Sequence, residues 1–111
     1  MDSLNRGDVG GGGPHRSFVA HSGVVGRRMA NETILVPVSS GVGDLDSIYT
    51  LSEVGSRIWE MLATPVSFGR LVEVICAEYD VSPEVASRDV AEFLDRLVSR
   101  KLARQEARDD A

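Results

Sequence analysis

The sequence is poor in the residues that most often carry catalysis. Among 111 residues there are one cysteine, Cys76, and two histidines, His15 and His21. A single cysteine excludes a disulfide within the chain and agrees with a reducing compartment. Both histidines lie in or beside a glycine-rich N-terminal stretch, which would not hold a catalytic base within reach of its proton.

Catalytic and metal-binding motifs are missing as well. The chain contains no GxSxG, HExxH, CxxC or Walker-type loop. Cys76 falls on the apolar stripe of a predicted helix, which favours a buried structural thiol over a nucleophile. No closely spaced metal ligands stand on a rigid element, so we expect no metal and no other cofactor. The sequence therefore favours a protein that is not an enzyme.

Long apolar runs and positive charge are also scarce. No segment approaches the roughly 20 apolar residues of a membrane helix, and the N-terminus lacks the apolar region of a secretion signal. We therefore expect a cytoplasmic protein without membrane contact. The formal net charge is −5, which disfavours nucleic acid as a partner because phosphate binding depends on lysine and arginine.

Glycine is abundant near the N-terminus, where residues 6–16 read "RGDVGGGGPHR". Four consecutive glycines followed by proline do not favour an ordered structure, so residues 1–22 are predicted to form a flexible tail. The C-terminal residues 105–111 are predicted to fray. A single small folded domain is expected over residues 23–104.

Three short β-strands are predicted at the start of this domain. Their residues are 23–29, 33–38 and 47–51, separated by a turn at Asn31-Glu32 and a loop over 39–46. Pro37 has no N–H to donate, which places it at a strand end or sheet edge. In the third strand, Tyr49 and Leu51 face one side and Ile48 and Thr50 the other.

Three helices follow, each preceded by a serine suited to cap it. The candidate caps are Ser52, Ser67 and Ser82, with Pro83 at the first position of the last helix. Thr50 with Glu53 is a competing capping box for the first helix. Helical spacing predicts core positions at Val54, Ile58, Trp59, Leu62, Leu71, Val72, Ile75, Cys76, Tyr79, Ala86, Val90, Phe93, Leu94 and Leu97. Arg100, Lys101 and Arg104 are predicted in the last turn.

Three strands followed by three helices predict a small α+β domain that is winged-helix-like. A winged-helix transcription regulator is therefore one alternative. The last helix carries one base, Arg88, against three acids, Glu84, Asp89 and Glu92, between Pro83 and Phe93. DNA would be repelled by this segment, so the sequence favours another ligand.

The alternative that we favour is a peptide groove. A short third strand followed directly by a helix leaves a sheet edge that can accept an extended peptide as an added strand. The last helix would form the opposite wall. The predicted peptide contacts are Ser47, Ile48, Tyr49, Thr50, Leu51, Val85, Asp89, Glu92, Phe93, Arg96 and Arg100. For each of these helix residues, the alternative to a peptide contact is a position on a solvent-exposed flank of the helix. For Phe93, the alternative is packing in the hydrophobic core.

From about Val24 to Ala103 the chain resembles the PqqD family, the small peptide-binding chaperones known as RiPP precursor recognition elements. The resemblance is carried by "ETILVPV", "IYTLSEVGSRIWEML" and "FGRLVEVICAEYDVSPEVASRDVAEFLDRLVSRKL". The chain departs from the family pattern at Ser52, where asparagine is usual, and at Lys101, where glycine is frequent. The loop over 41–46 is also long.

The resemblance implies a non-enzymatic adaptor that binds the leader segment of a ribosomally made precursor peptide. The leader would add as a strand beside residues 47–51, against the face of residues 85–100. The resemblance also implies a maturation enzyme as partner, often a radical S-adenosylmethionine protein. A structural subunit without peptide specificity is a further possibility. The open edge would permit strand exchange between copies, which leaves the oligomeric state open.

Overall fold

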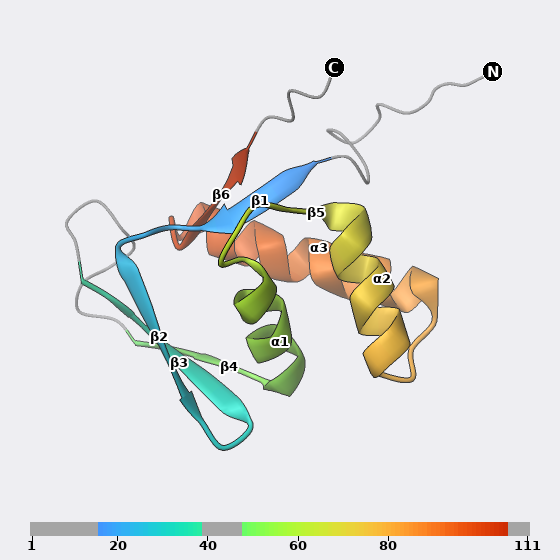
Figure 1. Cartoon of the computed structure of the whole chain (residues 1–111), viewed down its shortest axis with the longest axis horizontal. Helices are drawn as coiled ribbons and strands as arrows, with labels where there is room; N and C mark the ends of the chain where they lie inside the picture. Colours follow the sequence, from blue (N-terminus) through green and yellow to red (C-terminus); the bar gives the residue numbers. More distant parts are fainter. Residues whose placement is uncertain (1–15, 39–47, 107–111) are drawn as a thin grey trace.

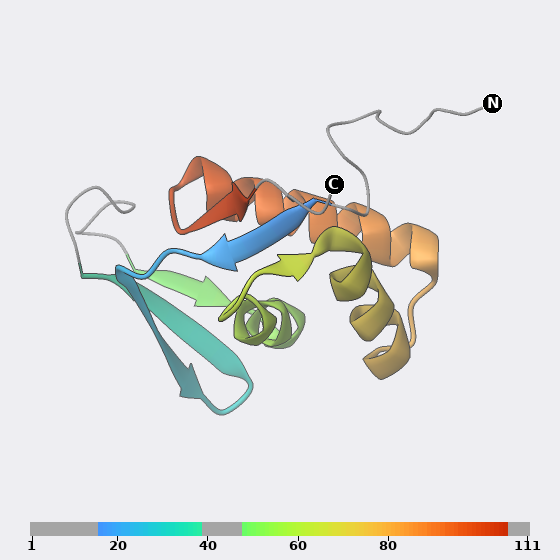
Figure 2. The same ribbon diagram turned by 45° about the horizontal axis from the view of Figure 1, so that its top comes forward.

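The computed structural model describes residues 16–38 and 48–106 of the chain. These residues form three helices and six short strands, arranged in two antiparallel sheets of three strands each (Figure 1). In chain order the elements are β1 (Ser17–Ala20), β2 (Val24–Met29), β3 (Glu32–Pro37), β4 (Tyr49–Leu51), α1 (Glu53–Met61), β5 (Val66–Ser67), α2 (Phe68–Glu78), α3 (Pro83–Ser99) and β6 (Ala103–Glu106). α1 lies between the two sheets, and α2 packs against α3 (Figures 1 and 2). The predicted α+β class is confirmed.

The sheet β2-β3-β4 contains the three strands that the sequence predicts. β3 pairs with β2 on one side and with β4 on the other, which leaves β4 at an edge. The turn of the β2–β3 hairpin lies at Ala30-Asn31, one residue earlier than predicted, because Met29 pairs with Glu32. Ala30 adopts the left-handed conformation there, with φ 56°. Pro37 ends β3, as its missing N–H requires.

The second sheet, β5-β1-β6, is absent from the prediction. β1 is its central strand, where Ser17 pairs with Ser67 of β5 and with Glu106 of β6. β1 lies within the predicted flexible tail, and β6 extends past residue 104. The ordered part of the chain therefore begins earlier and ends later than predicted. The physical reason is burial, because Phe18 of β1 belongs to the hydrophobic core.

A serine cap begins each of the three helices, as predicted. The hydroxyls of Ser52, Ser67 and Ser82 accept hydrogen bonds from the backbone N–H three residues further on, at 3.1–3.2 Å. Each bond satisfies an N–H that has no partner within its helix. Ser52 takes this role for α1, so the competing capping box at Thr50 is not the one used.

The end of α3 differs from the prediction. Lys101 has a left-handed φ of 62°, which stops the helix. The N–H groups of Lys101 and Leu102 donate to the carbonyls of Val98 and Leu97 at 3.0 and 2.9 Å. This is the Schellman arrangement, in which glycine is the usual left-handed residue. Lys101 and Arg104, predicted in the last turn, therefore lie outside the helix, with Arg104 in β6.

One hydrophobic core joins the two sheets and the three helices. The predicted core positions Ile58, Leu62, Leu71, Ile75, Ala86, Val90, Leu94 and Leu97 are buried, whereas Val54, Trp59, Val72, Cys76, Tyr79 and Phe93 are partly buried against it. Phe93 therefore lies at the margin of the core, where it is only partly buried. No described helix is long and apolar enough to span a bilayer.

Candidate functional site

An open groove of about 550 Å³ lies between β4 and α3, and we call it the β4–α3 groove. Its lining residues are Ile48, Tyr49, Thr50, Leu51, Ser52, Phe93, Arg96, Leu97, Arg100 and Leu102. β4 supplies one wall, and its outer edge has no neighbouring strand among the described residues. Unpaired main-chain groups at such an edge can hydrogen-bond to another extended chain.

The β4 wall alternates as predicted. Leu51 is buried and Tyr49 is partly buried against the core, whereas Ile48 and Thr50 are exposed. Ile48 exposes 67% of its surface, although it is a large apolar residue. The strand is held in register by β3, where Leu35 pairs with Tyr49. β4 is thus a strand of fixed register whose outer edge is open to a ligand, and the exposed apolar side chain of Ile48 stands directly before it.

The α3 wall is formed by one stripe of side chains. Phe93, Arg96, Leu97 and Arg100 recur at spacings of three and four, which places them on one side of the helix. Leu97 is buried and forms part of the floor, whereas both arginines are exposed. The guanidinium of Arg100 lies 5.8 Å from the centre of the Tyr49 ring, a cation–π contact that joins the two walls.

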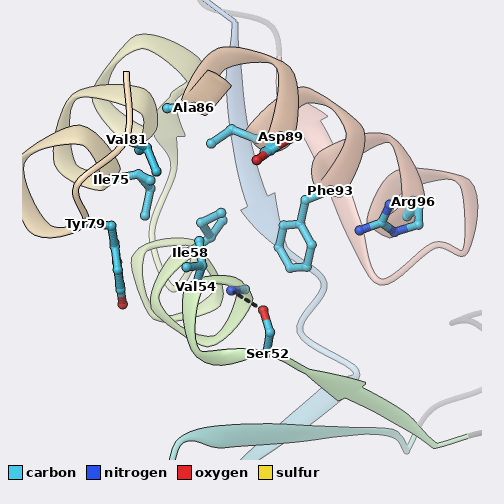
Figure 3. Close-up of a pocket in the computed structure, with 12 residues that line it drawn as sticks. Ser52, Val54, Ile58, Ile75, Tyr79, Val81, Ala86, Asp89, Phe93 and Arg96 are labelled. Atoms are coloured by element: carbon cyan, nitrogen blue, oxygen red, sulfur yellow. Dashed lines mark hydrogen bonds between the residues drawn. The ribbon is translucent and has the colours of Figure 1, made fainter. Parts of the chain in front are cut away.

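A second, smaller cavity of about 220 Å³ adjoins this groove, and we call it the Phe93 pocket. Its lining residues are Ser52, Val54, Gly55, Ile58, Ile75, Tyr79, Val81, Ala86, Asp89, Val90, Phe93 and Arg96. Ser52, Phe93 and Arg96 line both cavities. Figure 3 shows the Phe93 ring pointing from α3 toward the start of α1. Phe93 therefore stands between the two cavities.

Gly55 sets the position of the Phe93 ring. A Cβ atom at Gly55 would lie 3.1 Å from Phe93 Cε1 and 3.3 Å from Cζ, closer than ordinary contacts. The hydroxyl of Ser52 accepts a hydrogen bond from the Gly55 N–H at 3.2 Å, which fixes this first turn of α1 (Figure 3). The absence of a side chain at Gly55 thus allows the aromatic ring to lie directly on α1.

Tyr79 is one of the residues that line the Phe93 pocket. Burial raises the pKa of Tyr79, and the negative charges of Glu53 and Glu78 raise it further. The hydroxyl therefore stays protonated at neutral pH and adds no charge. Within the described residues, no group of three or more His, Cys, Asp or Glu side chains could hold a metal ion. The two cavities offer contacts for binding, chiefly apolar side chains and one strand edge.

The structure brings most of the predicted contacts together. Ile48, Tyr49, Thr50, Leu51, Phe93, Arg96 and Arg100 line the β4–α3 groove, and Asp89 lines the Phe93 pocket. Val85 and Glu92 line neither of these two cavities. Glu92 follows Asp89 by three residues and is turned toward solvent, and Val85 lies one helical turn before Asp89. Ser47 falls outside the described residues.

Several lining residues were not predicted as contacts. The sequence predicts Ser52 as a helix cap and Leu97 as a core residue. Each has its predicted role and also lines the groove. Leu102 follows the left-handed Lys101, so no helical pattern indicated its position. The Tyr79–Val81 turn lines the Phe93 pocket only because α2 ends beside α1 and α3. Tyr79, an aromatic residue just before the turn, was the feature of the sequence that could have indicated this part of the pocket.

The fold and groove define a small α+β domain in which an open strand edge faces a helix across a cleft. The sequence profile of the family described as Coenzyme PQQ synthesis protein D (PqqD) matches residues 32–103, more than half of the chain. The chain belongs to the PqqD family. The matched range runs from the start of β3 to the start of β6, so it includes both walls of the groove.

Two solved structures resemble this fold closely. A structure described as "TbiB1 in Complex with the TbiA(beta) Leader Peptide" is 29% identical, with a TM-score of 0.66, over 81% of this chain and 99% of that one. A structure described as "Lasso peptide synthetase B1 complexed with the leader peptide" is 19% identical, with a TM-score of 0.63, over 78% and 96%. The second likeness supports the fold alone. A search of curated proteins returned no match.

Proposed function

We propose that this protein binds the leader segment of a ribosomally synthesised precursor peptide and presents it to a modifying enzyme, without catalysing a reaction itself. The leader lies in the β4–α3 groove as an added strand beside β4. The observation that carries the proposal is the groove itself, which places an open strand edge opposite an apolar and cationic helix face. The similarity to TbiB1, whose structure contains a leader peptide, supports the same ligand class.

Strand addition explains why the groove combines these features. Main-chain hydrogen bonds along β4 would supply affinity that depends little on peptide sequence. Alternate peptide side chains would then point toward α3, where the Phe93 ring and the adjoining pocket can hold an apolar group. The peptide contacts predicted for Ser47, Val85 and Glu92 stay predictions.

A fluorescence anisotropy titration tests the proposal. The labelled probe is the leader segment of the precursor peptide encoded beside the gene, with a scrambled leader and a duplex DNA in parallel. We expect micromolar or tighter binding to the leader and no comparable binding to either control. Binding to the DNA alone, with a steep loss of affinity as salt rises, would instead support a winged-helix regulator.

The second part of the proposal is a partner enzyme that modifies the peptide. Holding the leader on an adaptor raises the local substrate concentration to about the millimolar range for a short linker, so an enzyme with a weak site can act. The resemblance to the PqqD family favours a radical S-adenosylmethionine protein as the partner enzyme. Co-purification of this protein with each modifying enzyme encoded nearby, with and without the leader, tests that assignment.

A further inference from the structure

The described residues that line the β4–α3 groove carry a charge opposite to that of the whole chain. The formal net charge of the protein is −5. Among the described residues, the charged side chains that line the groove are nevertheless those of two arginines, Arg96 and Arg100, and none of its described lining residues is acidic. A cationic groove on an acidic protein favours a ligand that brings negative charge of its own.

Neither of these arginines makes an ion pair within the described residues. Five other arginines do: Arg28, Arg57, Arg70, Arg88 and Arg104 each lie within 4.0 Å of a carboxylate oxygen. Arg96 and Arg100 are one helical turn apart, and two like charges at that spacing repel each other slightly. Their position near the C-terminal end of α3 suits the helix dipole. The dipole does not explain why both side chains line the groove.

The Arg100 side chain is held in place before a ligand binds. Its guanidinium lies over the Tyr49 ring at 5.8 Å, so the cation is stacked on the β4 wall. Arg96 lies at the junction of the two cavities and lines both. Guanidinium groups present planar, forked donors that match the geometry of a carboxylate. Two such groups beside a strand edge form a receptor for an acidic side chain.

We infer that the peptide bound in the β4–α3 groove carries an aspartate or glutamate whose carboxylate binds Arg96 and Arg100, next to an apolar side chain that contacts Phe93. This inference rests on the proposed function and adds a required residue type to it. The carboxylate is that of a side chain, because the C-terminus of a leader segment continues into the rest of the precursor. The ligand class is an extended acidic peptide.

The test combines protein variants with leader variants. The Arg96→Gln/Arg100→Gln double variant removes both guanidinium groups. Its matched control, Arg70→Gln/Arg104→Gln, removes the same charge from exposed residues that line neither cavity. The probes are the labelled leader and a set of leaders in which each Asp or Glu is replaced in turn by Asn or Gln. Thermal unfolding of each protein shows that the variants are folded.

We expect the groove double variant to bind the leader about tenfold more weakly, as loss of charge-assisted hydrogen bonds requires, and the control to bind like the wild type. One acid-to-amide replacement in the leader should weaken wild-type binding by a similar factor. The same replacement should not weaken the double variant further, because the two changes remove one interaction.

Different results would separate this inference from the proposed function. Tight wild-type binding to the leader, with no effect of the groove double variant, would overturn the acidic-residue requirement and leave the adaptor function standing. Tight binding of the wild-type protein to every leader in which an Asp or Glu is replaced by Asn or Gln would also overturn the acidic-residue requirement alone. Failure of the wild-type protein to bind the leader at all would overturn both.

Discussion

Two glycines set how closely aromatic side chains approach the backbone of this domain. Gly55 lies beneath the Phe93 ring at the groove, and Gly26 of β2 lies beside the indole of Trp59. A Cβ atom at Gly26 would lie 2.6 Å from Trp59 Nε1 and 3.2 Å from Cδ1. Such a distance is shorter than real contacts, so the indole would have to move. Trp59 packs against the core, which limits that movement.

Replacing Gly26 by alanine is therefore expected to destabilise the protein. Overpacking of this kind costs about 1–3 kcal/mol in free energy of unfolding. Urea denaturation of the wild type and of Gly26→Ala measures the difference. In a Trp59→Phe background, which lacks Nε1, the same glycine substitution should cost less. An equal cost in both backgrounds would show that the indole contact is not the cause.

Single residues were predictable from sequence where a local rule decides their role. Ser52, Ser67 and Ser82 cap their helices, and Tyr49 and Leu51 share a face of β4, because each pattern involves only neighbouring residues. Gly55 and Phe93, by contrast, are in close contact although they are 38 residues apart in the sequence. No local pattern in the sequence indicates that contact.

At the scale of elements, the end of α3 carries a strained residue. Lys101 adopts φ 62° at the position where a Schellman motif favours glycine. A left-handed conformation costs a residue with a Cβ atom roughly 1–2 kcal/mol, of which the greater freedom of unfolded glycine offsets a part. We therefore expect Lys101→Gly to raise the free energy of unfolding by about 0.5–1 kcal/mol.

Chemical denaturation checks this prediction against a matched control. Ser99→Gly introduces glycine two residues earlier, at the last residue of α3, where the backbone is helical. That control should destabilise by about 0.5–1 kcal/mol, because glycine gains nothing there and loses helix propensity. Two substitutions with effects of the same sign would contradict the role assigned to Lys101.

α1 and α2 are joined by a forked ion pair that predicts a pH dependence. Arg57 Nε and Nη2 donate to the two carboxylate oxygens of Glu78 at 2.8 and 3.0 Å. The hydrogen bonds from Arg57 hold the pKa of Glu78 below its ordinary value of 4.5. Because the pKa is lower in the folded state, the pair stabilises the fold above the unfolded pKa. That contribution is lost as the pH falls through the folded pKa.

The prediction is a small loss of thermal stability in Glu78→Gln at neutral pH that shrinks in acid. Both melting temperatures are measured at neutral pH and at about pH 3, below the ordinary pKa of a glutamate. The difference between wild type and variant should be larger at neutral pH. A difference that is the same at both values would mean that the carboxylate charge of Glu78 does not contribute.

The elements that the sequence did not reveal are those whose partners lie far along the chain. β1, β5 and β6 have four, two and four residues, too few to show a pattern of their own. They form a sheet because Phe18 pairs with Val66 and Gln105. By contrast, β2 and β3 are adjacent in sequence, and three of the six residues of β3 are β-branched, so the hairpin was predictable.

For the whole molecule, the proposed binding of a leader peptide depends on the outer edge of β4. The groove walls that sequence reasoning found, residues 48–51 and the stripe through Phe93, Arg96 and Arg100, face each other in the structure. Their mutual placement follows from the pairing of β4 with β3 and the packing of α3 on the core, which a local pattern cannot specify. The proposed function requires the bound peptide to run along this edge.

Amide hydrogen exchange, resolved by residue, tests that claim most directly. The protein is measured alone and with a saturating amount of the leader peptide. Strand addition predicts that the N–H groups of β4 that point away from β3 become protected on binding, because they donate to the added chain. The N–H groups of the edge strand β2, on the opposite side of the same sheet, should exchange unchanged. Leader binding without new protection in Tyr49–Leu51 would contradict strand addition at β4.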